Sequence, residues 1–208
     1  AALARIKESN PSPHLCGRVC SAPCEKACVL SQDASPIAIR ALERYAADCG
    51  HKLFAPARRQ VKATGKKAAI VGSGPAGLTA AQMLILKNYQ VTVFDALPVL
   101  GGVLRYGIPR FRLPDKILKR DLDDLTAMGV EFRPNQYVGH SLSIEDIFGQ
   151  GFAVIVLAVG TGGAHLSPLA GVNLSGVYYA EEFLMEVNLL SERVLRERLA
   201  GLAGKRCV

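Results

Sequence analysis

The pattern of apolar and polar positions differs between the first third of this chain and the rest. Before residue 65 the apolar residues come in short groups interrupted by proline and glycine, whereas later segments contain runs long enough for buried strands. Residues 66–95, KKAAIVGSGPAGLTAAQMLILKNYQVTVFD, are typical of a strand, a glycine turn, a helix and a second strand. This order is one βαβ unit, so the pattern predicts an α/β fold with a parallel sheet.

Two later segments continue the alternation of helix and strand. Residues 115–129 place apolar side chains at positions 118, 122, 125 and 128, which predicts a helix capped by Asp115 and ended by Gly129. The run FAVIVLAVG at 152–160 contains no alternating polar positions. It therefore predicts a parallel strand that is fully buried.

The first part of the chain predicts helices with a less regular stretch between them. Residues 1–9 are typical of a helix that breaks at Asn10-Pro11. Gly17 and Pro23 interrupt the stretch that follows, which is therefore expected to be mostly loop.

A second helix is predicted with Ser35 as its N-cap and Pro36 as its first residue, closing near residue 50. The composition of APARRQVKATG at 55–65 is typical of a linker. We therefore expect a small helical, cysteine-bearing segment at 1–62 and most of a Rossmann-like domain at 63–208.

Length and composition agree with this division. The chain has 208 residues, of which 50% are hydrophobic, enough to bury one full α/β domain and a smaller unit. No apolar run approaches the roughly 18 residues of a membrane span, and no charged-then-apolar leader opens the sequence. The sequence thus predicts a soluble cytoplasmic protein with no membrane segment, in which reduced cysteines are the default.

The formal net charge of +7 comes from three basic stretches, 58–67, 105–120 and 193–206. Aromatic residues make up only 6% of the chain, tryptophan is absent, and no aromatic residues interleave in these stretches in the manner of a nucleic-acid surface. The sequence therefore argues against nucleic acid as a partner. Phosphate groups or an acidic protein fit the charge better.

The glycine loop GSGPAG carries the first candidate chemistry. Its glycines follow a predicted strand directly and open a predicted helix, which is the context that a dinucleotide-binding motif requires. Gly72 would make the tight turn, Gly74 would let a pyrophosphate approach the backbone, and Gly77 would allow close packing of helix and strand. The helix N-terminus would then face the phosphates with its free amides.

Residues after the second strand bear on which nucleotide is bound. Asp95 is placed to accept hydrogen bonds from a ribose, and its carboxylate would repel the 2′-phosphate of NADP. The loop itself cannot distinguish FAD from NAD, since both contain adenosine diphosphate. A second glycine pair, Gly101-Gly102, would admit another backbone segment to an extended ligand, and nearby arginines could pair with its pyrophosphate: Arg105, Arg110 and Arg112.

Four of the six cysteines fall at even spacing in CGRVCSAPCEKAC, residues 16–28. Soft thiolates in a proline- and glycine-containing segment suit iron–sulfur clusters or zinc. Zinc sites usually show pairs separated by two residues, and here the gap is three, which favours iron–sulfur. Zinc, simple buried thiols and disulfides remain open alternatives.

The remaining cysteines and the histidines have plainer interpretations. Cys49 and Cys207 are predicted to be core residues. The histidines lie in loop-like sequence and are expected to be solvated or to cap backbone groups: His14, His51, His140 and His165.

Three motifs together resemble the small (beta) subunit of bacterial glutamate synthase and its relatives. They are GSGPAG, GGVLRYGIPRFRLP, and CGRVCSAPCEKAC followed by PIAIRALERY. The relatives include the N-terminal half of dihydropyrimidine dehydrogenase and the large subunit of NADH-dependent ferredoxin:NADP oxidoreductase. The resemblance covers essentially the whole chain.

The resemblance implies an electron-entry module in which NADPH reduces FAD and FAD passes electrons singly to 4Fe-4S clusters. It implies a redox partner as well: the glutamate synthase large subunit, ferredoxin or a similar protein. In this family the FAD site would comprise glycine-loop, ribose, second-segment and adenine positions: Gly72, Ser73, Gly74, Pro75, Ala76, Gly77, Asp95, Gly101, Gly102, Val103, Arg112 and Val138.

The resemblance also assigns metal ligands. Cys20 and Cys24 match ligands of one cluster, for which Glu43 would supply the fourth, carboxylate position. Cys28 matches a ligand of the neighbouring cluster, and Cys16 receives no assignment. No general acid, base or nucleophile is assigned, because hydride transfer to a flavin needs none from these residues.

Departures from the family pattern predict a fragment of a longer enzyme, inactive by itself. The family has a cysteine-rich segment before the position of residue 1, and it has a late Gly-Asp motif that this sequence lacks. GKRCV at 204–208 repeats the opening of GKKAAIV at 65–71, so the NADPH-binding domain would follow. Two alternatives remain: an NAD-binding dehydrogenase domain, or a zinc-bound interaction module fused to a non-catalytic Rossmann unit.

Overall fold

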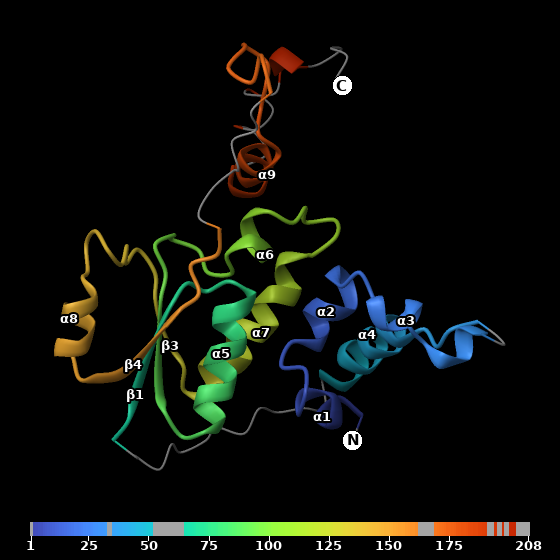
Figure 1. Ribbon diagram of the computed structural model, residues 1–208, viewed down its shortest axis with the longest axis horizontal. Coiled ribbons are helices and arrows are strands. Elements are labelled where there is room, and N and C mark those ends of the chain that lie inside the picture. The colour runs from blue at the N-terminus through green and yellow to red at the C-terminus, as the bar shows by residue number, and fades with distance from the viewer. Residues whose placement is uncertain are drawn as a thin grey trace.

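The computed structural model of the protein describes residues 2–32, 35–51, 65–161, 169–190, 194, 197 and 200–202 (Figure 1). A parallel sheet forms its centre, with helices on both faces and a group of short helices packed to one side. Cys207 and His165 lie outside the described residues, as does most of the predicted linker. In the described part of the chain, no helix has both the length and the apolar character needed to cross a bilayer.

The sheet contains β1 (Lys67–Val71), β2 (Gln90–Phe94), β3 (Glu131–Arg133) and β4 (Phe152–Leu157). Their order is β3-β2-β1-β4, and every pairing is parallel. The helix α5 (Pro75–Leu86) connects β1 to β2, so the predicted βαβ unit is present. The α/β fold class predicted from the sequence is confirmed.

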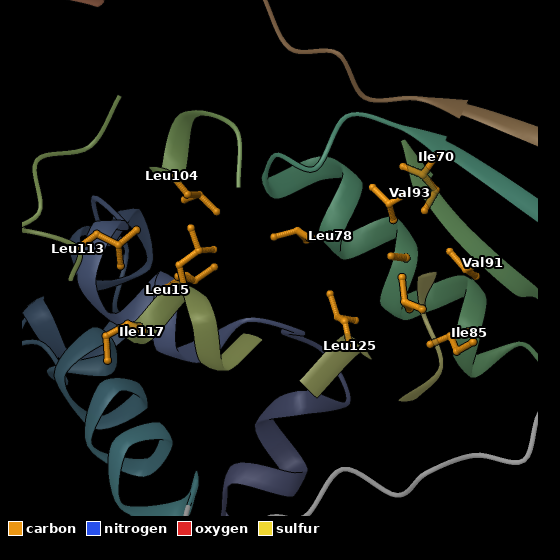
Figure 2. Close-up of a cluster of buried hydrophobic side chains, with 13 residues drawn as sticks. Leu15, Ile70, Leu78, Ile85, Val91, Val93, Leu104, Leu113, Ile117 and Leu125 are labelled. Atoms are coloured by element: carbon orange, nitrogen blue, oxygen red, sulfur yellow. The ribbon is translucent and has the colours of Figure 1, made fainter. Parts of the chain in front are cut away.

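Two apolar clusters pack on opposite faces of this sheet because successive strand residues point to opposite sides. The larger cluster joins β1 and β2 to α5 and to α7 (Asp115–Met128), and its members include Ile70, Leu78 and Leu125 (Figure 2). On the other face, Ile147 of α8 (Ile144–Gly149) packs with a second cluster that includes Phe94. Both strands of the βαβ unit are therefore covered on both faces.

The prediction of a fully buried parallel strand at 152–160 is confirmed for the strand but not for its burial. The strand β4 is parallel, but it is not fully buried, since the exposed fractions are 36% for Val154 and 66% for Leu157. β4 is one of the two edge strands of the described sheet. An apolar run without polar alternation therefore does not guarantee burial, because burial also requires neighbours on every side.

Helix α7 follows the prediction closely. It runs from Asp115 to Met128 and ends at Gly129, whose φ of 104° is a left-handed C-cap conformation. The N-cap, however, is Pro114, and Asp115 is the first helical residue. The Asp115 carboxylate in the first turn still interacts favourably with the positive end of the helix dipole.

The cysteine stretch is more helical than predicted. It contains α2 (Pro13–Val19) and α3 (Pro23–Lys26), preceded by α1 (Ala2–Lys7) and followed by the 3-10 helix η1 (Val29–Gln32). Pro13 and Pro23 occupy first-turn positions, where proline's fixed φ suits a helix and its missing N–H costs nothing. The prediction of a mostly loop segment was wrong because Gly17 lies inside α2 and Pro23 begins α3.

Helix α4 (Ile39–Gly50) ends where predicted but begins later, with Ala38 at the N-cap. The prediction of Ser35 and Pro36 as its first residues was wrong. The backbone N–H of Arg40 donates to a side-chain oxygen of Glu25 from α3 (2.8 Å). A carboxylate from a neighbouring helix thus satisfies the first turn of α4.

The helical segment packs directly on α7. Leu15 of α2 belongs to the larger apolar cluster, together with Leu113 and Ile117 (Figure 2). Lys7 and Asp124 form an ion pair (2.8 Å) in which both side chains are about nine-tenths buried. The N-terminal helices are therefore joined to the Rossmann-like part by apolar and ionic contacts together.

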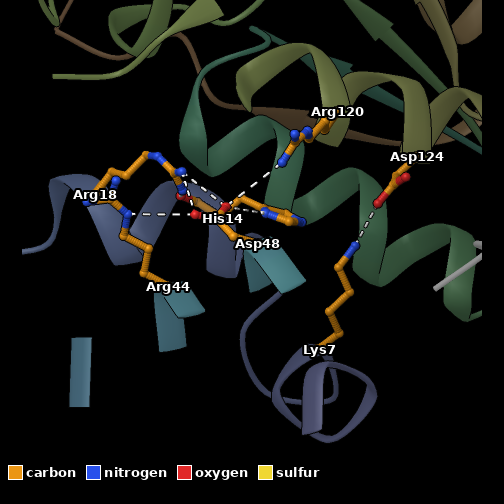
Figure 3. Close-up of polar contacts among 7 residues, drawn as sticks. All are labelled: Lys7, His14, Arg18, Arg44, Asp48, Arg120 and Asp124. Carbon is orange, nitrogen blue, oxygen red and sulfur yellow. Dashed lines mark hydrogen bonds and ion pairs between the residues drawn. The ribbon is translucent and has the colours of Figure 1, made fainter. Parts of the chain in front are cut away.

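Asp48 of α4 is the centre of a charged cluster at the same interface (Figure 3). It pairs with Arg18 (2.7 Å), Arg44 (3.7 Å) and Arg120 (3.9 Å), which come from α2, α4 and α7. The guanidinium of Arg18 donates two hydrogen bonds to the carboxylate of Asp48. One carboxylate thus joins three helices.

His14 corrects another expectation. It lies in α2 and is fully buried, with its ring edge-on to His51 (5.1 Å between centroids). Burial lowers the pKa of His14 to about 4. The ring is therefore a neutral core group at neutral pH, not a solvated or capping residue.

Candidate functional site

The glycine loop lies at the carboxyl edge of the sheet, between β1 and α5. Gly72 has a φ of 104°, and a Cβ there would lie 2.3 Å from the carbonyl oxygen of Ala158. A Cβ on Gly77 would lie 1.9 Å from the carbonyl oxygen of Gly72. Neither position can hold a side chain without moving backbone, so both glycines are needed for the turn and for close packing.

Gly74 differs from the other two because space is open in front of it. No heavy atom lies within 4 Å of the position that its Cβ would occupy. Gly74 is the N-cap of α5, and Pro75 follows it in the first turn. An open, side-chain-free surface at the start of a twelve-residue helix fits a diphosphate group, because the first helical amides lack partners within the helix.

Ser73 links this loop to the end of β2. Its backbone N–H donates to one carboxylate oxygen of Asp95 (2.7 Å), and its hydroxyl donates to the same oxygen. The backbone N–H of Gly101 in turn donates to the Ser73 hydroxyl (2.8 Å). Ser73 is completely buried, so its side chain connects three loop segments, while its role at a pyrophosphate stays a prediction.

Asp95 is buried beside the loop, with 7% of its surface exposed. Its second carboxylate oxygen accepts the backbone N–H of Leu97 (2.9 Å). Each carboxylate oxygen can accept more than one hydrogen bond, so these contacts leave capacity for a hydroxyl group. Asp95 follows β2 at the carboxyl edge as expected, and its contact with a ribose stays a prediction.

The second glycine pair lies against the first loop. Gly102 has a φ of 52°, and a Cβ there would lie 2.8 Å from the Cα of Gly74. Gly101 has a φ of 127°, and its Cβ would lie 2.5 Å from the side chain of Leu118. The structure therefore brings together two segments that the sequence separates, and it leaves the Cβ side of Gly74 open beside them.

The helix α6 (Val103–Tyr106) begins at the second glycine pair. Val103 is half exposed on this helix, whereas Tyr106 is buried and its hydroxyl donates to the carbonyl oxygen of Val99 (2.6 Å). Arg105 pairs with Asp115 (2.8 Å) at the start of α7. Arg105 is thus held by a carboxylate within the chain.

Arg112 and Val138 lie on two different loops. Arg112 is exposed in the turn between α6 and α7, where its backbone N–H donates to Pro109 (2.9 Å). Val138 follows β3 and packs against the second apolar cluster. Its loop is joined to the end of β2 by a hydrogen bond from the Gln136 N–H to the Asp95 carbonyl (2.8 Å), so Val138 lies on the Asp95 side of the site.

The cysteines lie on the helical segment. The sulfur of Cys20 accepts the backbone N–H of Ala22 (3.3 Å). Backbone N–H groups, that of Ile37 first and those of Leu30 and Ser31 with it, lower the pKa of the Cys28 thiol. Amide donors directed at sulfur favour the thiolate and are typical surroundings of cluster ligands.

Glu43 and Cys16 share a neighbour. The side chain of Asn10 donates to Glu43 (2.7 Å), and the Cys16 thiol is 3.6 Å from the Asn10 side-chain oxygen. Burial raises the pKa of Cys16. Across the described residues, no three histidine, cysteine, aspartate or glutamate side chains are gathered closely enough to hold a metal ion. The ligand roles of Cys20, Cys24, Cys28 and Glu43 stay predictions.

Two functionally placed contacts were missed by the sequence analysis. They are the buried bridge from Asp95 through Ser73 to Gly101, and the contact of Asn188 with the end of α6. A single asparagine at the end of an otherwise mostly apolar helix was the available signal for Asn188. No local signal marks Ser73, because its partners lie 22 and 28 positions away.

Two family models match the chain. Residues 1–53 match dihydropyrimidine dehydrogenase domain II, 4Fe-4S cluster. Residues 70–114 match the NAD(P)-binding Rossmann-like domain. Residues 54–69 lie between the two matches.

Curated relatives match nearly the whole chain. The glutamate synthase [NADPH] small chain of Mycobacterium tuberculosis is 41% identical over 92% of this chain and 39% of its own length. The small chain of Escherichia coli is 36% identical over 86% of this chain and 38% of its own length. The chain thus spans about two fifths of the length of these relatives, and the resemblance predicted from the motifs is confirmed.

A solved structure supports the fold. The structure of Mycobacterium tuberculosis FprA in complex with NADPH matches this chain with a TM-score of 0.52 and 23% sequence identity. The match covers 58% of this chain and 28% of the FprA chain. The match shows that the sheet and its helices have the arrangement found in that protein.

Proposed function

We propose that this homologue of the glutamate synthase small chain is the electron-entry part of an NAD(P)H oxidoreductase, in which electrons pass through FAD to 4Fe-4S clusters. One observation carries the proposal: Gly102 lies against the backbone of Gly74, and the Cβ side of Gly74 faces open space. Two side-chain-free backbone segments meet there, beside the N-terminus of α5. This arrangement favours an extended dinucleotide that is contacted from two segments.

The adenosine end of FAD would be held by the first segment and its surroundings. Gly72 to Gly77 would present backbone to the pyrophosphate, and the N-terminus of α5 would stabilise its charge. Asp95 would accept the ribose hydroxyls, and Val138 would lie near the adenine. Arg112, exposed at the turn before α7, would supply a positive charge to the phosphates.

The flavin end would be held by the second segment, from Gly101 to Val103. Bound FAD supplies the conversion of a two-electron hydride into single electrons. The residues named here would orient it and keep its diphosphate fixed. This second segment favours an FAD-binding domain over a plain NAD-binding dehydrogenase domain, because NAD binding does not need a second backbone segment.

The helical segment would carry the clusters. Cys20 and Cys24, with Glu43 as the carboxylate position, would serve one cluster, and Cys28 would serve the other. The amide donor to the sulfur of Cys20 and the lowered pKa of the Cys28 thiol support this role. A redox partner, such as a large synthase subunit or a ferredoxin, would receive the electrons.

Absorbance and metal analysis of the intact protein, purified anaerobically, test the proposal. We expect flavin absorbance bands, with iron and acid-labile sulfide present in excess over zinc. A protein without flavin that binds NAD would instead be a dehydrogenase domain. Stoichiometric zinc without iron would identify the interaction-module alternative.

A further inference from the structure

Asn188 is a buried polar side chain outside the site described so far. It lies near the end of α9 (Ala180–Leu189) and is only 2% exposed. Its side-chain NH2 group donates two hydrogen bonds, one to the carbonyl oxygen of Tyr106 (2.9 Å) and one to that of Ile108 (3.1 Å). A helix 80 positions later in the chain thus contacts the segment that follows Gly101-Gly102.

The two carbonyl groups that accept these hydrogen bonds lie at the end of α6. The last carbonyl groups of a helix have no partner within the helix, so a one-turn helix such as α6 needs partners from elsewhere. An amide side chain supplies two donors from one nitrogen, which matches two neighbouring carbonyls. Leucine at this position would leave both carbonyls without a donor, and aspartate would place further acceptors against them.

A charged contact joins the same two elements. The guanidinium of Arg110 donates to the backbone carbonyl oxygen of Asn188 and also lies 3.5 Å from Asp115. Asp115 holds Arg105 as well. The backbone from 105 to 110 is therefore fixed at both ends of this turn, by α9 on one side and by the start of α7 on the other.

The arrangement of elements shows why this contact matters. α9 lies directly over α6, and its main packing among the described elements is with α6 (Figure 1). On the other side of α6, the Tyr106 hydroxyl is bound to Val99 and the Gly101 N–H is bound to Ser73. Asn188 thus belongs to a set of buried and part-buried hydrogen bonds that links residues 99–108 to α9 and to Ser73.

We propose that Asn188 is a positioning residue for the flavin end of the dinucleotide site. Its amide holds the end of α6 and thereby keeps Gly101 to Val103 in place against Gly74. This inference rests on the proposed function, because it assigns the second segment to FAD. It predicts that loss of the Asn188 amide weakens binding of FAD and leaves binding of ADP, which uses only the first segment, unchanged.

The experiment measures FAD and ADP affinity of the intact apoprotein by calorimetry for wild type, Asn188→Asp and Asn188→Leu. We expect the Kd for FAD to rise about tenfold, as for the loss of one or two buried hydrogen bonds, and the Kd for ADP to stay within about twofold. Hydrogen exchange at residues 103–108 should become faster in both variants. Glu182→Gln, an exposed change on the same helix, is the control and should alter none of these values.

Four results would overturn the inference. One is unchanged FAD affinity in a folded Asn188→Leu protein, and another is an equal loss of FAD and ADP affinity, which would indicate general damage. If neither variant folds, fast exchange at residues 103–108 in the ligand-free wild type would count against it, and protection there would support it. A wild type that binds ADP but no FAD would instead defeat the proposed function, and the inference with it.

Discussion

The glycine-rich site and the cysteine-bearing helices are built by different means. At the site, backbone lies against backbone: Gly77 against Gly72, and Gly102 against Gly74. The cysteine-bearing helices are attached through side chains, with Leu15 in the apolar core and Asp48 paired with Arg120 of α7. The backbone contacts leave no room for an added side-chain atom. The side-chain contacts can lose one side chain while the others keep the helices packed.

The proposed function gives a reason for this difference. A dinucleotide site would need backbone amides at fixed positions, and only glycine allows the close approach. A segment that carried redox clusters would need only to stay at a fixed distance from the site. Side-chain packing on α7 provides that, because Leu15, Lys7 and Asp48 all contact residues on or next to this helix.

The largest expected effect comes from filling the closest backbone contact. Gly77→Ala should destabilise the fold by several kcal/mol or prevent folding, because its Cβ would lie 1.9 Å from a carbonyl oxygen. Gly74→Ala is the matched variant: it should leave the free energy of unfolding nearly unchanged and still abolish ADP binding, since its Cβ enters the open space. Urea unfolding and calorimetry measure the two effects. Normal ADP binding by Gly74→Ala would contradict the location of the site.

The next effect tests the side-chain attachment. Leu15→Ala should lower the free energy of unfolding by ~2–5 kcal/mol, because Leu15 is 4% exposed within the core cluster shared with α7. Leu42→Ala, on a residue of α4 that is 58% exposed, should cost less than ~0.5 kcal/mol. Denaturant unfolding followed by circular dichroism compares them. Equal effects would mean that the helical segment is not packed into the common core.

A smaller effect separates ribose binding from loop positioning. Asp95→Ala should weaken ADP binding by ~1–3 kcal/mol, the range for a hydrogen bond to a charged group or for leaving its partner unpaired. Ser73→Ala removes the hydroxyl bridge to Gly101 but keeps the carboxylate. We expect it to weaken ADP binding less than Asp95→Ala does. Equal losses in calorimetry would show that Asp95 acts through the loop alone.

The smallest expected effect is the pH dependence of wild-type stability between pH 4 and 6.5, because two buried groups oppose each other. Burial raises the pKa of Asp121 to about 6, so its contribution to stability is present at low pH and lost as pH rises through that value. Burial lowers the pKa of His14 to about 4, so stability increases as pH rises from 4 to its unfolded pKa of about 6.5. The two slopes have opposite signs.

Variants should separate the two slopes. Asp121→Asn should make stability increase with pH across this range, and His14→Gln should make it decrease. The midpoint of urea unfolding, measured at several pH values, shows each slope. The same slope in both variants would contradict the opposed titration of Asp121 and His14.

The sequence alone was sufficient for the βαβ unit, the glycine loop, helix α7 and the resemblance to the glutamate synthase small chain. These features depend on residues close together in the chain: glycine spacing, a 3.6-residue apolar period and a glycine C-cap. A short motif constrains the backbone directly, so it can be recognised without knowing the rest of the fold.

Tertiary structure alone decided the features that depend on distant partners. The start of α4 depends on Glu25 from another helix, and the burial of His14 depends on packing against α7 and His51. The links from Ser73 to Gly101 and from Asn188 to Tyr106 join positions 28 and 82 residues apart. No local pattern identifies the partners in such contacts, because hydrogen bonds and burial are set by which surfaces the folded chain brings together.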